Sequence, residues 1–257
     1  MPEGDTVHRA AQRVAEALVG KEILSIEAPQ PRHRFDRLPE RLGGRRVRAV
    51  EVRGKHLLLR FDGGLSVHSH LGMGGSWAVH RRGERWRRSA PRAWVVFRTR
   101  DHDVVQFDGP VLELMSDART RSDPRIAGLG PDVLAPELQE DLVLRALRSD
   151  DPRRPIGDAL LDQRNVAGIG NIWRSEACFA AGLDPWRRLA ELDDDELLRP
   201  VRAARELMRR SLDGSAAAPR SVYGRAGLPC RSCGSTIARR RMGDFASTVY
   251  WCPECQR

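Results

Sequence analysis

The chain has 257 residues, which is enough for two modest domains with buried cores. It carries 44 Lys and Arg against 35 Asp and Glu, and the resulting net charge of +9 favours a polyanionic partner, nucleic acid first. Because the sequence has no apolar run of membrane-spanning length and no signal-peptide layout, we expect a cytoplasmic, intracellular protein without a membrane partner.

A helix is predicted immediately after the first residues. Asp5 or Thr6 can cap it, and Gly20 can stop it. Between them, apolar residues recur at three- and four-residue steps, at Val7, Ala10, Ala11, Val14 and Leu18. If this stripe packs on a core, the preceding Pro2 and Glu3 are held in place instead of fraying.

Short β-type runs with turn signals between them follow the helix and predict a β-sandwich or barrel-like domain. The predicted strands cover residues 22–28, 45–53, 56–61, 65–70, 76–80, 93–99 and 104–107. Gly54-Lys55 and Asp108-Gly109-Pro110 are among the turns. Residues 81–92 form a loop with six arginines, which is either a solvated charged face or a phosphate contact.

Helical spacing takes over after about residue 120, so the fold class is predicted to be α+β. The predicted helices cover residues 136–148, 155–163, 171–182 and 194–212. Pro200 lies inside the last segment and indicates a helix that starts at Arg199 or later. The run Gly128-Leu129-Gly130-Pro131 is a plausible hinge between the two halves.

Four cysteines near the C-terminus have the spacing of a zinc ribbon. Cys230-x2-Cys233 is followed, after eighteen residues, by Cys252-x2-Cys255, with room for a β-hairpin between the pairs. With four thiolates and no vacant ligand position, one Zn²⁺ in this site is predicted to be structural. A redox Cys-x-x-Cys or a chance cluster is the alternative. Arg239–Arg241 lie inside the hairpin, where their guanidinium groups can meet phosphates.

A glycine-rich break separates two helical segments in the middle of the second half. Gly168 and Gly170 precede a helix that begins at Asn171. Backbone N–H groups and the Asn171 amide at a helix N-terminus suit a phosphate. An ordinary helix hairpin, whose glycines only make the turn, is an equally good interpretation.

The first five residues allow an unusual chemistry. Removal of Met1 gives Pro2 a free secondary amine, and an α-amino group is partly uncharged, and therefore nucleophilic, near neutral pH. Attack on a sugar aldehyde carbon gives an iminium ion, which acidifies the neighbouring C–H and permits strand-breaking elimination. A frayed terminus is the structural alternative.

Taken together, these segments resemble the family of formamidopyrimidine-DNA glycosylase and endonuclease VIII, and the opening Pro-Glu-Gly is more similar to the endonuclease VIII branch. The matching segments are residues 1–4, 53–59, 70–76, 156–185, 222–225 and 252–256. The resemblance implies a β-sandwich catalytic domain at 1–125, a helical domain with a helix-two-turn-helix at 126–225, and a four-cysteine zinc finger at 226–257.

The resemblance also implies roles for single residues. Pro2 corresponds to the nucleophile that attacks C1′, and Glu3 to the acid/base that protonates the opening deoxyribose. Lys55 corresponds to a lysine that contacts a phosphate beside the lesion and supports catalysis. A plain hairpin-tip lysine is the alternative for Lys55.

Three further residues are implied to bind DNA. Asn171 and His70 match contacts to the phosphate backbone. Met73, on a glycine-rich loop, matches the residue that is pushed into the base stack where the damaged base was, so that an apolar side chain offsets part of the unstacking cost.

The sequence departs from the family pattern at three places. Thr6 stands where a glutamate is common. The stretch that probes the orphaned partner base in the formamidopyrimidine branch has no counterpart around residues 109–115. Ser247 stands where the zinc finger usually has a phosphate-binding arginine, and Arg241 is the replacement that we expect.

The sequence therefore predicts a monomeric, nucleoid-associated DNA glycosylase and AP lyase of base-excision repair, acting on damaged DNA with a preference for oxidised pyrimidines. One alternative is a weakly catalytic or non-catalytic protein on the same scaffold that binds DNA lesions or single strands. A second is a tautomerase in which the N-terminal proline is a base.

Overall fold

The computed structural model describes residues 2–31, 36–214, 220–243 and 246–257. Met1, whose removal the predicted chemistry requires, lies outside the described residues. The chain forms two compact units. The first contains Pro2 and residues 6–128, and the second contains Glu3–Asp5 and residues 129–257.

Two four-stranded antiparallel sheets build the first unit. One has the strand order β1 (Ser25–Glu27), β6 (Ala93–Arg98), β7 (His102–Phe107) and β5 (Ser76–Arg81). The other has the order β2 (Val47–Arg53), β3 (His56–Phe61), β4 (Leu65–His70) and β8 (Val111–Ser116). The predicted sandwich is confirmed, and β8 is a strand that the sequence did not predict.

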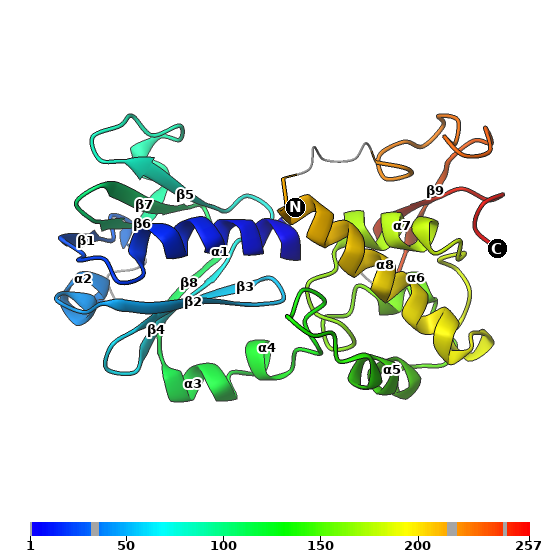
Figure 1. The fold of residues 1–257 in the computed structure, drawn as a ribbon, viewed down its shortest axis with the longest axis horizontal. Helices are drawn as coiled ribbons and strands as arrows, with labels where there is room; N and C mark the ends of the chain where they lie inside the picture. The colour runs from blue at the N-terminus through cyan, green and yellow to red at the C-terminus, as the bar shows by residue number, and fades with distance from the viewer. Residues whose placement is uncertain (1, 32–35, 215–219, 244–245) are drawn as a thin grey trace. The chain divides into compact units, whose positions relative to one another are not determined.

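Helix α1 (Gly4–Leu18) lies along the sandwich, between its two sheets (Figure 1). Val7, Val14 and Leu18 are buried in a core that includes Leu57 and Leu59 from one sheet and Phe97 from the other. The predicted stripe is therefore confirmed. The predicted cap at Asp5 or Thr6 is wrong, since the helix already includes Gly4 and places Asp5 in its first turn.

Short helices complete the first unit. They are α2 (Leu38–Leu42), the 3-10 turn η2 (Ala90–Arg92), α3 (Asp117–Ser122) and α4 (Pro124–Ala127). Ser116 and Asp123 cap α3 and α4 by accepting hydrogen bonds from the backbone N–H groups of Arg119 and Arg125. Ser116, the last residue of β8, thus ends the strand by starting α3, and Asp123 separates α3 from α4.

The second unit is helical around its own core. It contains α5 (Glu140–Ser149), α6 (Ile156–Ala159), α7 (Asn171–Ala180), the 3-10 turn η3 (Leu189–Glu191) and α8 (Asp194–Leu212). The predicted start of the last helix at Arg199 is wrong, because Asp193 and Glu196 form a capping box and Pro200 lies buried inside the helix. The strong cap and the packing of Pro200 outweigh the hydrogen bond that proline cannot donate.

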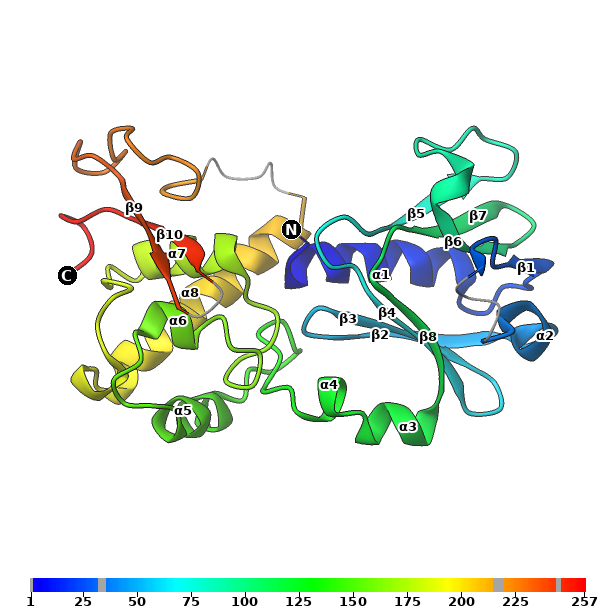
Figure 2. The same cartoon turned by 180° about the vertical axis from the view of Figure 1, so that it is seen from behind.

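A β-hairpin closes the second unit and pairs β9 (Ala238–Met242) with β10 (Ser247–Trp251). It packs on α7, where the Tyr250 N–H donates to Ser175 Oγ at 3.4 Å (Figure 2). A separate zinc-finger domain from residue 226 stays a prediction. None of the helices within the described ranges is long and apolar enough to cross a membrane.

Candidate active site and nucleic-acid interface

Glu3 is bound at the N-terminus of α7. Its carboxylate accepts hydrogen bonds from the backbone N–H groups of Gly170 (3.1 Å), Ile172 (2.7 Å) and Trp173 (3.2 Å), and the side chain is only 1% exposed. The positive end of the helix dipole favours a carboxylate at this position. A β-carbon at Gly170 would lie 2.3 Å from Cδ of Glu3, so the glycine is required for the approach. We call this set of hydrogen bonds between Glu3 and the start of α7 the seat of Glu3. It fixes the position of the residue next to Pro2.

This geometry corrects one expectation from the sequence. The two glycine N–H groups before α7 that suit a phosphate are already occupied. Gly170 N–H donates to Glu3, and Gly168 N–H donates to Gln163 Oε1 at 3.0 Å. Glu3 also accepts from Ile172 and Trp173 in the first turn of α7. The anion at this helix N-terminus is supplied by the chain itself. Sequence reasoning missed this because the partners are more than 160 residues apart.

Asp5, which also belongs to the second unit, makes two further hydrogen bonds there. Its Oδ1 accepts from the indole Nε1–H of Trp173 at 2.9 Å, and its Oδ2 accepts from the Ser211 hydroxyl at 2.8 Å. Gly4 N–H donates to the carbonyl of Gly168 at 2.9 Å. The three residues Glu3–Asp5 are thus held by both α7 and α8.

Asn171 and the hairpin are brought together. The Asn171 amide donates to the carbonyl of Thr248 at 3.0 Å, its Oδ1 accepts from the buried Arg174, and Thr248 pairs across the hairpin with Arg241. Arg241 is exposed, whereas the neighbouring Arg240 stacks over the Trp186 ring at 4.9 Å. Burial holds the pKa of Arg174 down at about 10.

The four cysteines converge as a metal site. Their sulfur atoms all lie within 4.8 Å of one another, with Sγ–Sγ distances of 3.9 Å for Cys230–Cys255 and 3.4 Å for Cys233–Cys252. Tetrahedral Zn–S bonds of about 2.3 Å place sulfurs about 3.8 Å apart, so this donor set fits one Zn²⁺. With four thiolate ligands the ion is structural, and it ties the loops that carry the hairpin.

Lys55 and His70 meet at one end of the first unit's β2–β3–β4–β8 sheet. Lys55 lies in the two-residue turn between β2 and β3, and the adjacent His56 pairs across the sheet with His70. The pKa of His70 is lowered, first by burial and then by the positive charge of Lys55. Gly72 N–H donates to His70 Nδ1 at 3.2 Å, so a neutral His70 carries its proton on Nε2.

Two further histidines lie behind His70 and were missed in the sequence. His68 is fully buried, and its Nε2 lies 2.8 Å from Nδ1 of His56, whose ring packs 4.7 Å from that of His70. The pKa of His68 is lowered to about 4 and that of His56 to about 3, in both cases mainly by burial. The sequence did contain a signal for His68, because residues two apart on a predicted strand, such as His68 and His70, lie on the same face of the sheet.

Met73 is the most exposed large apolar side chain among the described residues, with 82% of its surface accessible. It lies in residues 71–75, which we call the wedge loop. Leu71 is buried, and Gly75 N–H closes the loop by donating to the Leu71 carbonyl at 2.8 Å. The loop therefore exposes an apolar side chain that none of the described residues of its unit covers.

Glu176 is another buried carboxylate that the sequence did not single out. It accepts from the backbone N–H groups of Ser221 (2.8 Å), Val222 (3.0 Å) and Tyr223 (2.7 Å). This contact fixes the beginning of the Val222–Arg225 motif against α7. Three donors on one buried carboxylate indicate a constrained segment.

Comparison with known proteins gives matches along the whole chain. Residues 1–121 match the formamidopyrimidine-DNA glycosylase N-terminal domain, and residues 129–220 match the formamidopyrimidine-DNA glycosylase H2TH domain. A probable endonuclease 8 2 of Streptomyces coelicolor is 42% identical over all of this chain and 94% of its own length. The DNA-(apurinic or apyrimidinic site) lyase Nei2 of Mycolicibacterium smegmatis is 38% identical over all of this chain and 99% of its own length.

The chain belongs to the formamidopyrimidine-DNA glycosylase and endonuclease VIII family of DNA glycosylases and AP lyases. Its fold is that of Lactococcus lactis formamidopyrimidine-DNA glycosylase, solved with DNA that contains an abasic site. The two share a TM-score of 0.85 and 24% identity, and each chain is covered completely.

Two departures from the family pattern can be located in this member. Thr6 is half-buried and directly follows the anchored Asp5, so a carboxylate is present one position earlier than the expected glutamate. Ser247 pairs with Met242 at the end of the hairpin, next to the Thr248–Arg241 pair. Arg241 therefore lies one register position from the missing arginine.

Proposed function

We propose that this protein excises oxidised bases from DNA, with pyrimidines favoured, and then cleaves the strand through a Schiff base on Pro2. The observation that carries the proposal is the seat of Glu3, whose carboxylate is bound by three N–H groups of α7. A nucleophile at a chain terminus is useful only if the terminus is ordered. The membership of the chain in a glycosylase and lyase family supports the same chemistry.

In this mechanism Met1 is removed, and the uncharged secondary amine of Pro2 attacks C1′ of the flipped nucleotide. The C1′–N bond to the base breaks, and ring opening gives an iminium ion between Pro2 and the sugar. The Glu3 carboxylate accepts the proton that the Pro2 nitrogen loses as its bond to C1′ forms, and then donates this proton to O4′ of the opening deoxyribose. Loss of a C2′ proton then expels the 3′-phosphate by β-elimination, and a second elimination expels the 5′-phosphate.

Four residues are proposed to hold the DNA backbone near the lesion. Lys55 supplies a charge beside the lesion phosphate, and His70 donates from Nε2, since its Nδ1 is occupied by Gly72 N–H. Asn171 and Arg241 act from α7 and the hairpin, which their common contact with Thr248 ties together. The structural zinc supports this role by fixing the hairpin loops.

Met73 is proposed to fill the space that the flipped base leaves. An exposed thioether chain can stack in the duplex and offset part of the unstacking cost. The preference for pyrimidines is supported by the short turn at Asp108–Pro110, which leaves no long segment between β7 and β8 to probe the opposite base. Relatives named endonuclease 8 are consistent with this preference.

Borohydride trapping on DNA with one abasic site tests the proposal. The processed protein should form a covalent adduct with the DNA. Protein purified with Met1 retained, and verified by its mass, should bind the same DNA without forming an adduct, because its Pro2 nitrogen is an amide. Binding by the processed protein without any adduct would establish the alternative, a DNA-lesion or single-strand binding protein.

Substrate preference requires a second assay. Oligonucleotides with single lesions, in single- and double-stranded form, should show faster excision of oxidised pyrimidines than of 8-oxoguanine. Turnover of a small carbonyl compound in the absence of DNA would instead indicate a proline tautomerase. An intracellular location and a monomeric state stay predictions.

A further inference from the structure

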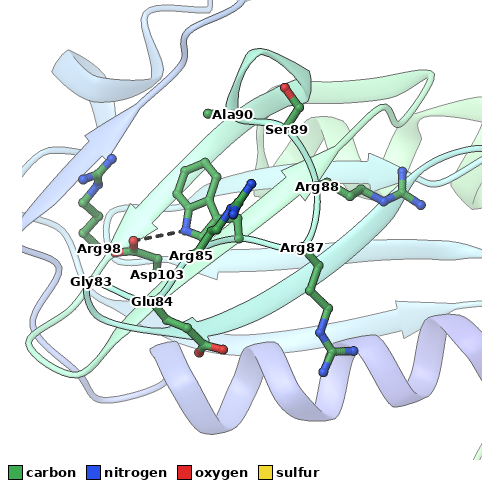
Figure 3. Close-up of a pocket in the computed structure, with 10 residues that line it drawn as sticks. Gly83, Glu84, Arg85, Arg87, Arg88, Ser89, Ala90, Arg98 and Asp103 are labelled. Atoms are coloured by element: carbon green, nitrogen blue, oxygen red, sulfur yellow. Dashed lines mark hydrogen bonds between the residues drawn. The ribbon is translucent and has the colours of Figure 1, made fainter.

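The loop between β5 and β6 is pinned by ion pairs on two different sides. Arg82 pairs with Asp103 at 2.9 Å, whereas Arg88 and Arg92 both pair with Asp108, at 2.9 and 2.6 Å. In Figure 3, Arg88 extends to the opposite side of the loop from Asp103, which accepts a hydrogen bond from the Trp86 indole. These arginines are therefore not all part of a solvated charged face.

Asp108 belongs to the turn that packs on the wedge loop, residues 71–75. A β-carbon at Gly75 would lie 2.7 Å from Cα of Gly109, and one at Gly72 would lie 2.6 Å from Cγ of Pro110. Gly72 also has a φ of +55°, which a side chain would strain. The two loops thus touch backbone to backbone, and a shift of one displaces the other.

Arg88 connects the two loops directly. One of its nitrogens, Nη1, donates to the Gly74 carbonyl at 3.1 Å and to Asp108 Oδ2 at 2.9 Å. Burial raises the pKa of Asp108, but hydrogen bonds from Arg92 and Arg88 outweigh it and hold the pKa below its usual value. The carboxylate therefore stays ionised near neutral pH, and the contact persists.

We propose that Arg88, Asp108 and Arg92 form a positioning cluster that fixes the wedge loop and so presents Met73 to the DNA stack. The Met73 side chain is 82% exposed, so its own packing cannot hold it. Its position depends on the backbone of Gly72–Gly75, which the cluster anchors. This inference rests on the proposed role of Met73 in lesion excision.

Asp108→Asn tests the cluster, since it keeps the size of the side chain and removes the charge that both arginines bind. Loss of a charge-assisted hydrogen bond should lower single-turnover excision of a damaged base about tenfold. Cleavage at a preformed abasic site, where no damaged base has to be unstacked, should fall only about twofold. Arg88→Gln should show the same imbalance and is the second variant if Asp108→Asn folds poorly.

Asp103→Asn is the matched control, because Asp103 binds Arg82 and Trp86 in the same loop but does not contact the wedge loop. Its ratio of excision to lyase activity should equal that of the wild type. A double variant, Met73→Ala with Asp108→Asn, should lose no more excision than Met73→Ala alone, since both changes act through one side chain.

A merely structural role of Asp108 would lower both activities equally and add to the effect of Met73→Ala, and either result would overturn the inference. Fluorescence of 2-aminopurine opposite the lesion reports insertion directly, and Asp108→Asn should reduce its change on binding. If the wild type forms no borohydride adduct, the proposed function fails. If it does, and the ratio in Asp108→Asn is unchanged, only the positioning cluster fails.

Discussion

Replacement of Glu3 by glutamine separates the structural role of this carboxylate from its proposed chemistry. The glutamate binds three buried N–H groups with two oxygens: Oε1 accepts from Ile172, and Oε2 accepts from both Gly170 and Trp173. Glutamine has a single acceptor oxygen, and its NH2 group must face the remaining donors. At least one buried N–H group is therefore left without an acceptor, whichever way the amide turns.

The expected cost follows from this unsatisfied donor and from the missing charge. A buried donor without a partner costs about 1–3 kcal/mol, and removal of the charge at a helix N-terminus adds about 0.3–1 kcal/mol. Glu3→Gln should therefore destabilise the protein by about 1–4 kcal/mol. At roughly 2–4 °C per kcal/mol for chains of this size, Tm should fall by roughly 3–16 °C.

Differential scanning calorimetry without DNA measures this effect independently of catalysis. Glu16→Gln is the control, because Glu16 is exposed on the same helix and its replacement should change stability by less than about 0.5 kcal/mol. A Tm for Glu3→Gln within about 1 °C of the wild type, on the same scale of roughly 2–4 °C per kcal/mol, would refute the seat of Glu3 on α7.

Three further changes test other parts of the structure. Removal of zinc with a chelator should abolish DNA binding measured by fluorescence anisotropy, and unchanged affinity of the metal-free protein would contradict a role for the cysteine cluster. The pKa of His68 is lowered from 6.5 to about 4 in the folded protein. Between pH 6.5 and pH 4 the unfolded chain therefore binds more protons at this residue than the folded chain does. The stability that the neutral His68 contributes is complete above pH 6.5 and is lost as the pH falls towards 4. Urea unfolding should show that His68→Gln reduces the loss between pH 7 and pH 5 by about 2 kcal/mol, and equal losses in both proteins would count against the buried neutral histidine. Asp5→Asn should cost about 1–2 kcal/mol, because one of Trp173 and Ser211 then faces a donor, and its Tm should fall accordingly; an unchanged Tm argues against this anchor.

Local patterns in the sequence predicted most of the secondary structure. The alternating strands from β2 to β7 and the stripe of α1 follow from side-chain periodicity, which burial on one face imposes directly. The cysteine spacing predicted the metal site for a similar reason, since each Cys-x-x-Cys pair directs two thiolates to one ion within a few residues. Such features depend on residues that are close together in the chain, so the sequence is sufficient to predict them.

Some local signals were overruled by packing. Pro200 predicted a later helix start, yet the Asp193–Glu196 capping box and the burial of the proline place it inside α8. Asp5 looked like a helix cap, but its carboxylate is directed to Trp173 and Ser211. For Pro200, the cap and the burial of the ring outweigh a penalty of about 3 kcal/mol for proline inside a helix. For Asp5, tertiary contacts outweigh a capping preference worth about 1 kcal/mol.

From the sequence alone, residue type and spacing indicated Pro2 and the four cysteines, and the resemblance to the family added Glu3, Lys55 and Met73 as candidates. Only the tertiary structure decided what holds them. The N–H groups predicted for a phosphate are filled by Glu3, which approaches Gly170 from 167 residues away. The arginine loop is linked through Arg88 to the carbonyl beside Met73. Contacts of this kind leave no periodic trace in the sequence, because each depends on where two distant backbones come together.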